Sequence, residues 1–234
     1  MTARLQGTTT IRFASGMLAM LFLFNFAAYA GPPLICHQIE IGNAKSLPWV
    51  SRDWNLSGGE NYDTRNLVRD TLAILDSGAP VLVRMETLRR ATLYARKDPQ
   101  AAKELLTKLY TRATAAEFAG HSDGLAWFDA GYLAETYQQW IGRGENRPAA
   151  GLDGYVWVQK AIALRGQDPQ MEFAASLITL SGPAEKHRGH VEKAVAGAKS
   201  DALLAQNLSA RFIGSQSPTI AELFASNSAA KKAN

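Results

Sequence analysis

The sequence predicts an all-α protein of antiparallel helical hairpins, arranged as a solenoid or a bundle, with an irregular N-terminal arm after a signal peptide. Three observations support this fold class. The chain is rich in alanine and poor in runs of β-branched residues, which favours helix over strand. Apolar residues recur at helical spacing through most of the chain. The segments between these stretches are short, as expected when consecutive helices are antiparallel neighbours.

Residues 1–30 are typical of a secretory signal peptide. Arg4 and Arg12 give a positive start without acidic residues, an apolar stretch follows, and residues 28–30 read Ala-Tyr-Ala. Small residues at these two positions are what a signal peptidase recognises, so we expect cleavage after Ala30 and a secreted or periplasmic protein. The alternative is an uncleaved segment that anchors the chain, which is the only membrane association we expect.

The charge of the chain does not indicate a nucleic-acid partner. Residues 1–30 contain two of the 25 Lys and Arg residues and none of the 21 Asp and Glu residues, so their removal lowers the net charge from +4 to +2. The remaining basic residues form no stripe or large cluster. Proteins that bind nucleic acids usually display one, and we therefore expect no such partner.

Residues 31–62 are expected to form the irregular arm, because prolines and glycines are frequent there and the only strand-like run, residues 39–41, is too short to support a sheet. Trp49, Trp54 and Tyr62 are its large aromatic residues. Such side chains either pin an irregular segment onto a helical core or form a surface that binds a partner or a sugar. We regard them as candidate partner-binding residues, together with Trp127.

Residues 63–214 are expected to form the helical domain, and its first half is predicted as four helices. Asp63 begins the first, which ends at Ser77-Gly78, and the second follows Pro80. Asp98-Pro99 provides a cap and a proline at the first helical position for the third. The fourth begins at Ser122 or Asp123 and runs to Ile141. In the second helix, Glu86 and Arg90 are four residues apart and are expected on its outer side.

The second half is predicted as four more helices, at about 152–165, 169–178, 184–199 and 201–213. Glycines and a proline interrupt the pattern at 142–151, which is either a linker between two domains or a long loop. The helix at 152–165 carries apolar residues on all sides, so we expect it to be central and buried. Asp168-Pro169 repeats the cap-and-proline start. Residues 215–234 are expected to be a mostly flexible tail.

Two segments of the domain resemble each other. Residues 91–100 (ATLYARKDPQ) and 161–170 (AIALRGQDPQ) align without gaps and each opens a new helix. Trp127, Ala130, Gly131 and Ala134 have the spacing of the conserved first-helix positions of a tetratricopeptide repeat, with Ala at the Leu and Tyr positions. Residues of about 79–181 therefore resemble degenerate tetratricopeptide-type hairpins. This resemblance implies stacked hairpins that bind peptides or helices of partner proteins.

Cys36 and His37 are the first candidate metal ligands, because thiolate and imidazole groups bind zinc or copper. A zinc site usually needs four ligands, so other side chains would have to join them. His187 and His190 are three residues apart on one helical face, and their imidazole groups are candidates for the additional ligands. A metal-binding or redox protein that uses Cys36 and His37 is thus one functional alternative, with a packing role for these residues as the other interpretation.

Four carboxylates, Glu86, Glu117, Asp129 and Glu135, lie on predicted helices and are the candidates for acid–base chemistry. An envelope enzyme that acts on glycan would need two of them to face each other across a cleft. The sequence contains no nucleophile elbow, phosphate-binding glycine loop, dinucleotide fingerprint or HExxH pair, and no catalytic residue is assigned.

The function that these observations favour is therefore an exported, soluble helical protein that acts in protein–protein interaction or as an envelope scaffold. We expect a protein partner; the sequence favours a role without catalysis but leaves an enzyme open. The glycan-acting enzyme and the metal or redox protein are the two alternatives.

Overall fold

The computed structural model describes residues 32–49, 61–141 and 147–212. These ranges contain helices and connecting segments but no strand, so the predicted all-α class is confirmed. The helices are α1 (Leu67–Asp76), α2 (Val81–Ala95), α3 (Pro99–Phe118), α4 (Gly124–Trp140), α5 (Gly154–Leu164), α6 (Pro169–Ile178), α7 (Ala184–Gly197) and α8 (Ala202–Phe212), with short 3-10 helices at Thr64–Asn66 and Ala198–Ser200. The expected signal peptide, Trp54 and the tail at 215–234 lie outside the described residues.

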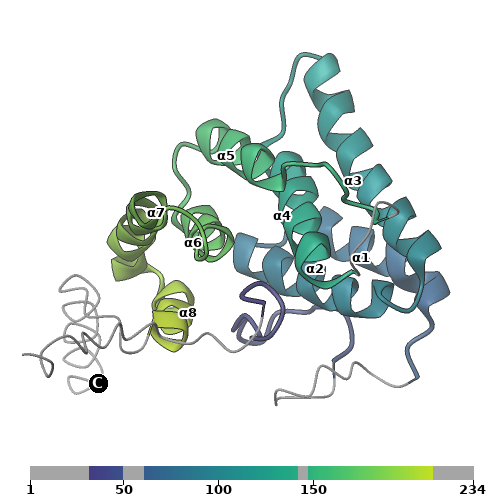
Figure 1. Cartoon of the computed structure of the whole chain (residues 1–234), viewed down its shortest axis with the longest axis horizontal. Coiled ribbons are helices and arrows are strands. Elements are labelled where there is room, and N and C mark those ends of the chain that lie inside the picture. The colour runs from purple at the N-terminus through teal and green to yellow at the C-terminus, as the bar shows by residue number, and fades with distance from the viewer. Residues whose placement is uncertain (1–31, 50–60, 142–146, 213–234) are drawn as a thin grey trace, which may run out of the picture.

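The helices form two groups joined by α5. Figure 1 shows α1 to α4 on one side, α6 to α8 on the other, and α5 along the top between them. Helices adjacent in the chain pack together, most closely α4 with α5 and α6 with α7. Within the described ranges, no helix has both the length and the apolar character needed to cross a membrane.

Aspartates begin several of these helices, as the sequence predicts. Asp98 accepts the backbone N–H of Ala101 at 3.0 Å, and Asp168 accepts that of Gln170 at 3.0 Å. Each bond satisfies an N–H group that has no partner within its own helix. The two Asp-Pro pairs therefore begin α3 and α6 where the sequence analysis places them.

Helix α2 is the centre of the molecule. Every residue of α2 except Arg90 is buried, and the buried set includes Arg84, Glu86 and Arg89. The prediction that Glu86 lies on the outer side of this helix is therefore wrong, because its side chain is 0% exposed. Spacing alone suggested an ordinary surface ion pair, whereas Glu86 is surrounded by cations and by the arm.

Helix α5, in contrast, is not central, and that prediction is also wrong. Val156 is 51% exposed and Leu164 is 45% exposed. The helix lies against α4 along a seam of glycines, where a Cβ atom on Gly131 would approach the carbonyl oxygen of Gly154 to 2.6 Å. Because α4 and α5 pack directly on each other, the interruption at 142–151 joins two helices of one packed unit.

Candidate functional site

Of the predicted arm at 31–62, the structure describes residues 32–49 and 61–62, and we keep the name arm for residues 32–49. This segment lies between the two groups of helices and contains no helix or strand. Figure 1 shows it, in purple, between α2 and α8. Its side chains of Leu34, Ile35, Ile39 and Leu47 are at most 2% exposed. The helices contact its backbone through side chains that we call the arm-binding surface: Glu86, Arg89, Arg90, Tyr94, Gln139, Asn207 and Arg211.

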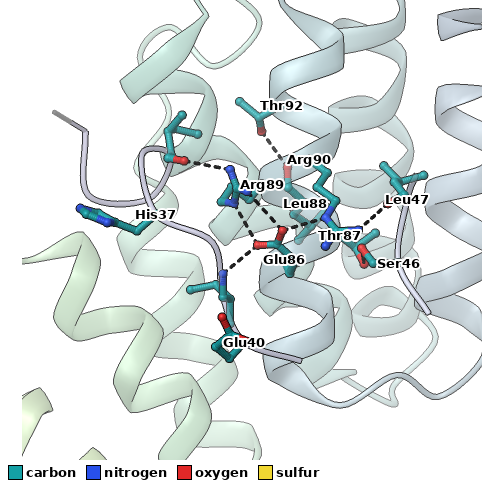
Figure 2. Close-up of polar contacts among 12 residues, drawn as sticks. His37, Glu40, Ser46, Leu47, Glu86, Thr87, Leu88, Arg89, Arg90 and Thr92 are labelled. Carbon is teal, nitrogen blue, oxygen red and sulfur yellow. Dashed lines mark hydrogen bonds and ion pairs between the residues drawn. The ribbon is translucent and has the colours of Figure 1, made fainter. Parts of the chain in front are cut away.

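Glu86 is the central residue of the arm-binding surface. Its carboxylate accepts the backbone N–H of Ile39 at 2.9 Å, and also Nε of Arg89 at 2.9 Å and Nε of Arg90 at 2.7 Å. Arg89 in turn donates to the carbonyl oxygen of Ile35 at 3.0 Å. In Figure 2 these three side chains point from α2 toward the ribbon of the arm. The buried charges of α2 are thus balanced against each other and against backbone dipoles of the arm.

The far end of the arm is held in the same way. Arg90 donates to the carbonyl oxygen of Leu47 at 2.6 Å, and the hydroxyl of Tyr94 donates to the carbonyl oxygen of Pro48 at 2.5 Å. Arg90 therefore contacts Glu86 on its own helix and the arm at once. Charged donors form stronger hydrogen bonds than neutral ones, so this contact fixes the arm as well as pairing the charge.

Helix α8 binds the other side of the arm. The amide of Asn207 accepts the N–H of Glu40 and donates to the carbonyl oxygen of the same residue, each at 2.9 Å. Arg211 donates to the carbonyl oxygens of Pro33 at 3.0 Å and His37 at 2.8 Å. The donors and acceptors of these two side chains match the backbone of a peptide, whatever its side chains are.

The arm-binding surface can therefore hold a non-helical peptide segment by its main chain. Gln139 on α4 completes it by accepting the N–H of Leu34 at 2.9 Å. Backbone contacts hold such a segment in position, while the pockets that receive its apolar side chains select which segment fits. In this molecule the bound segment is the chain's own arm.

Cys36 and His37, the sequence-predicted metal ligands, lie in the arm next to the arginines. Burial raises the pKa of the Cys36 thiol, although Arg89 and Arg211 oppose the change. Burial lowers the pKa of His37, and the same two arginines lower it further. A thiol with a raised pKa is a poorer nucleophile and a poorer metal ligand, because both roles need the thiolate.

His187 and His190 each have a partner in the packing of α6 and α7. His187 Nδ1 lies 2.9 Å from the carbonyl oxygen of Ser176, and His190 Nδ1 lies 2.5 Å from a carboxylate oxygen of Glu172. Among the described residues, no group of three or more His, Cys, Asp or Glu residues is arranged to hold a metal ion. The structure thus does not bring Cys36 and His37 together with these histidines, and the zinc or copper hypothesis stays a prediction.

The predicted partner-binding aromatics fall into two clusters. Trp49 and Tyr62 both pack on Tyr94, with ring centroids 6.0 and 4.4 Å from it, so they pin the arm and its continuation onto α2. Trp127 is only 5% exposed, and its ring lies 6.1 Å from that of Trp157. One aromatic face of each tryptophan is taken by a cation, since Arg89 lies over the ring of Trp49 and Lys160 over the ring of Trp127.

The candidate acid–base carboxylates are also engaged. Asp129 is fully buried and pairs with Arg84 at 2.5 Å; burial raises the pKa of Asp129 to about 7 although Arg84 opposes the change. Glu117 pairs with Lys160 at 2.5 Å. Glu135 accepts the backbone N–H of Tyr155 at 3.0 Å, while Glu86 belongs to the arm-binding surface. These contacts give each carboxylate a role in packing.

Sequence reasoning missed the residues that contact the arm most directly. Arg89, Asn207 and Arg211 are all buried, yet each is polar and was assigned no role. The available signal was their position: each lies on a helix within an apolar stripe, where a polar side chain needs a partner. The binding partner of each residue could not be predicted from the sequence: Asn207 and Glu40, for example, are 167 residues apart.

A scan against models of protein families, a search of curated proteins and a search of solved structures each found no match to this chain. The tetratricopeptide-type resemblance therefore stays a prediction. Function has to be inferred from the contacts described above.

Proposed function

We propose that the protein is an exported helical interaction module that binds a non-helical segment of a partner protein. The observation that supports this most is the arm-binding surface, which holds a peptide segment by its main chain through side chains of α2, α4 and α8. The signal-like start of the sequence supports a secreted or periplasmic location, and hence a partner in the cell envelope.

The chemistry of the arm defines the partner segment. Five buried apolar side chains anchor it, namely Leu34, Ile35, Ile39, Ile41 and Leu47. Most of the remaining polar contacts are made with the backbone, which every peptide carries, although Ser46 also bonds Thr87 through its hydroxyl at 2.9 Å. A partner segment with branched apolar residues at this spacing satisfies the same donors and acceptors. The chain's own arm then competes with the partner for the arm-binding surface, because both need the same amide of Asn207.

The experiment uses residues 31–234 and a fluorescent peptide of residues 32–49 as the probe. Wild-type protein is compared by fluorescence anisotropy with a variant whose own arm is weakened by Leu34→Ala and Ile39→Ala. We expect the variant to bind the probe at least about tenfold more tightly, since its own arm competes less well. Adding Asn207→Ala to this variant should abolish most of the gain.

Two controls make the result decisive. A probe with Asp in place of both Leu34 and Ile39 should not bind, because a charge cannot replace the buried anchors. Circular dichroism establishes that each variant keeps its helices. If the folded, arm-weakened variant does not bind the unaltered probe, the arm-binding surface is not a peptide site and the proposal is wrong.

A further inference from the structure

A second cluster of polar side chains lies where α5, α6 and α7 meet, away from the arm-binding surface. The hydroxyl oxygen of Tyr155 on α5 lies 2.7 Å from Nε2 of His190 on α7. Nδ1 of the same ring lies 2.5 Å from Oε2 of Glu172 on α6. The three residues thus form a continuous chain of hydrogen bonds that runs from a buried carboxylate to a partly exposed phenol.

The direction of the hydrogen bonds follows from the carboxylate. The side chain of Glu172 is 0% exposed, and Nζ of Lys193 lies 3.2 Å from its second oxygen. An opposite charge at this distance favours the ionised form of the carboxylate. An ionised carboxylate only accepts hydrogen bonds, so Nδ1 of His190 carries a hydrogen. In the neutral ring Nε2 is then an acceptor, and the phenol of Tyr155 donates to it.

This order of groups is the one that activates a hydroxyl as a nucleophile. A carboxylate orients an imidazole, and the imidazole removes the proton of the hydroxyl as the hydroxyl oxygen attacks. The oxygen of Tyr155 also accepts a hydrogen bond from Nε2 of Gln159 at 3.1 Å. A hydroxyl oxygen has two lone pairs, so these contacts leave one of them for a new bond.

Burial raises the pKa of the Tyr155 phenol, and Glu172 and Asp153 raise it further, so the phenol reacts only when a base removes its proton during the attack. Positive charge lies close to the aromatic ring. Nζ of Lys186 is 6.0 Å from the centre of the Tyr155 ring, and Lys193 contacts the far end of the same chain of hydrogen bonds. The order carboxylate, imidazole and hydroxyl is also the order found in sites that transfer acyl groups. This favours an acyl group as the electrophile.

We propose that Tyr155 is a base-activated nucleophile that accepts an acyl group from an activated ester. The phenol oxygen forms a bond to the carbonyl carbon while its proton passes to Nε2 of His190. The bond between that carbon and the ester oxygen of the leaving group breaks, and the proton then neutralises the leaving group. The product is an acyl ester on Tyr155. His190 is the general base and Glu172 is a positioning residue for its ring.

The test treats the protein, residues 31–234, with p-nitrophenyl acetate and measures the rate of acetylation of each tyrosine by peptide mass spectrometry. Tyr110 is the internal reference, because it is 42% exposed and its described ring contacts are tryptophans rather than a histidine. We expect Tyr155 to be acetylated at least about tenfold faster than Tyr110, since general bases contribute more than this in favourable geometry. Equal or slower acetylation of Tyr155 in the wild-type protein overturns the proposal without any variant.

Variants then separate activation from packing. His190→Gln keeps an amide that can bond both neighbours but cannot take up a proton at neutral pH, and Glu172→Gln removes the charge that orients the ring. Each should reduce the ratio of the Tyr155 rate to the Tyr110 rate to about one. An unfolded variant would also give a ratio near one, so circular dichroism has to show that each variant keeps its helices before the ratio is interpreted. An unchanged ratio in His190→Gln contradicts the role of His190.

Discussion

Glu86 accepts the backbone N–H of Ile39 at 2.9 Å, although the two residues are 47 positions apart and Glu86 lies in the most buried helix of the molecule. The carboxylate is paired with two guanidinium groups at the same time. A fully buried carboxylate is stable only when such partners surround it, so the arm is part of the environment that allows α2 to carry charges in the core.

Glu86→Gln tests this environment. The substitution keeps the size of the side chain but removes the negative charge that offsets Arg89 and Arg90. Breaking a buried ion pair on one side commonly costs about 3–5 kcal/mol, and we expect a loss of that order in the free energy of unfolding. Urea denaturation followed by circular dichroism measures it.

The matched control is Glu117→Gln. Glu117 also pairs with a cation, Lys160, but both side chains are at least one third exposed to solvent. Exposed ion pairs contribute less than about 1 kcal/mol, so this variant should unfold almost as the wild type does. Equal losses in the two variants would show that burial of Glu86 has no energetic consequence.

Gly131→Ala tests the seam between α4 and α5. The added Cβ would lie 2.6 Å from the carbonyl oxygen of Gly154 and 2.9 Å from the backbone nitrogen of Val158, so the two helices must move apart. We expect a loss of about 1–3 kcal/mol. Gly189→Ala, on α7, is the control: a Cβ there meets nothing within 4 Å, and alanine favours helix, so its midpoint of denaturation should stay or rise.

Asp168→Ala tests the cap of α6. The side chain accepts the backbone N–H of Gln170 at 3.0 Å and that of Met171 at 3.4 Å. Losing a cap of this kind costs about 1 kcal/mol, whereas Asp168→Asn keeps an oxygen in the same place and should cost much less. Thermal melts of the two variants compare them. A larger loss in Asp168→Asn than in Asp168→Ala would contradict the capping role.

His187 should lower the stability of the protein as the pH falls through the range where histidine titrates, whereas Asp129, whose pKa burial raises to about 7, acts in the opposite direction in both wild type and variant. Burial lowers the pKa of His187 below its ordinary value of 6.5. Just below pH 6.5 the unfolded chain therefore binds a proton at this residue and the folded chain does not, which favours unfolding. In His187→Gln the loss of stability between about pH 7 and pH 5 should be smaller. Part of the loss should remain, because burial also lowers the pKa of His37. Denaturation curves across this range measure both slopes, and identical slopes would contradict the role of His187.

Local features of the fold could be predicted from the sequence because they depend on neighbouring residues. The helices begin and end within a few residues of their predicted positions, and Asp98 and Asp168 form the caps that their Asp-Pro pairs indicate. These signals arise within a single turn of helix. They do not require knowledge of any residue distant in the sequence.

The relative depth of the helices could not be predicted in this way. Helix α2 contains Arg84, Glu86 and Arg89, which lower its hydropathy. Asp129 on α4 neutralises Arg84, Glu86 and Arg89 neutralise each other, and the helix is central. Helix α5 has more apolar residues around it, yet only one side packs on α4. The candidate site could not be predicted for the same reason: Asn207 binds Glu40, which is 167 residues away in the sequence.

The central claim is that the arm is bound as a separable peptide and is not simply a piece of the core. Native-state hydrogen exchange measures this most directly, by comparing the amides of residues 34–47 with those of α4 at increasing, sub-denaturing urea. We expect the arm to open as a unit, with a free energy of opening below that of α4 and a smaller dependence on urea. If the arm amides exchange only with the same free energy and the same urea dependence as α4, the arm is released only by global unfolding, and the account of a peptide-binding surface is contradicted.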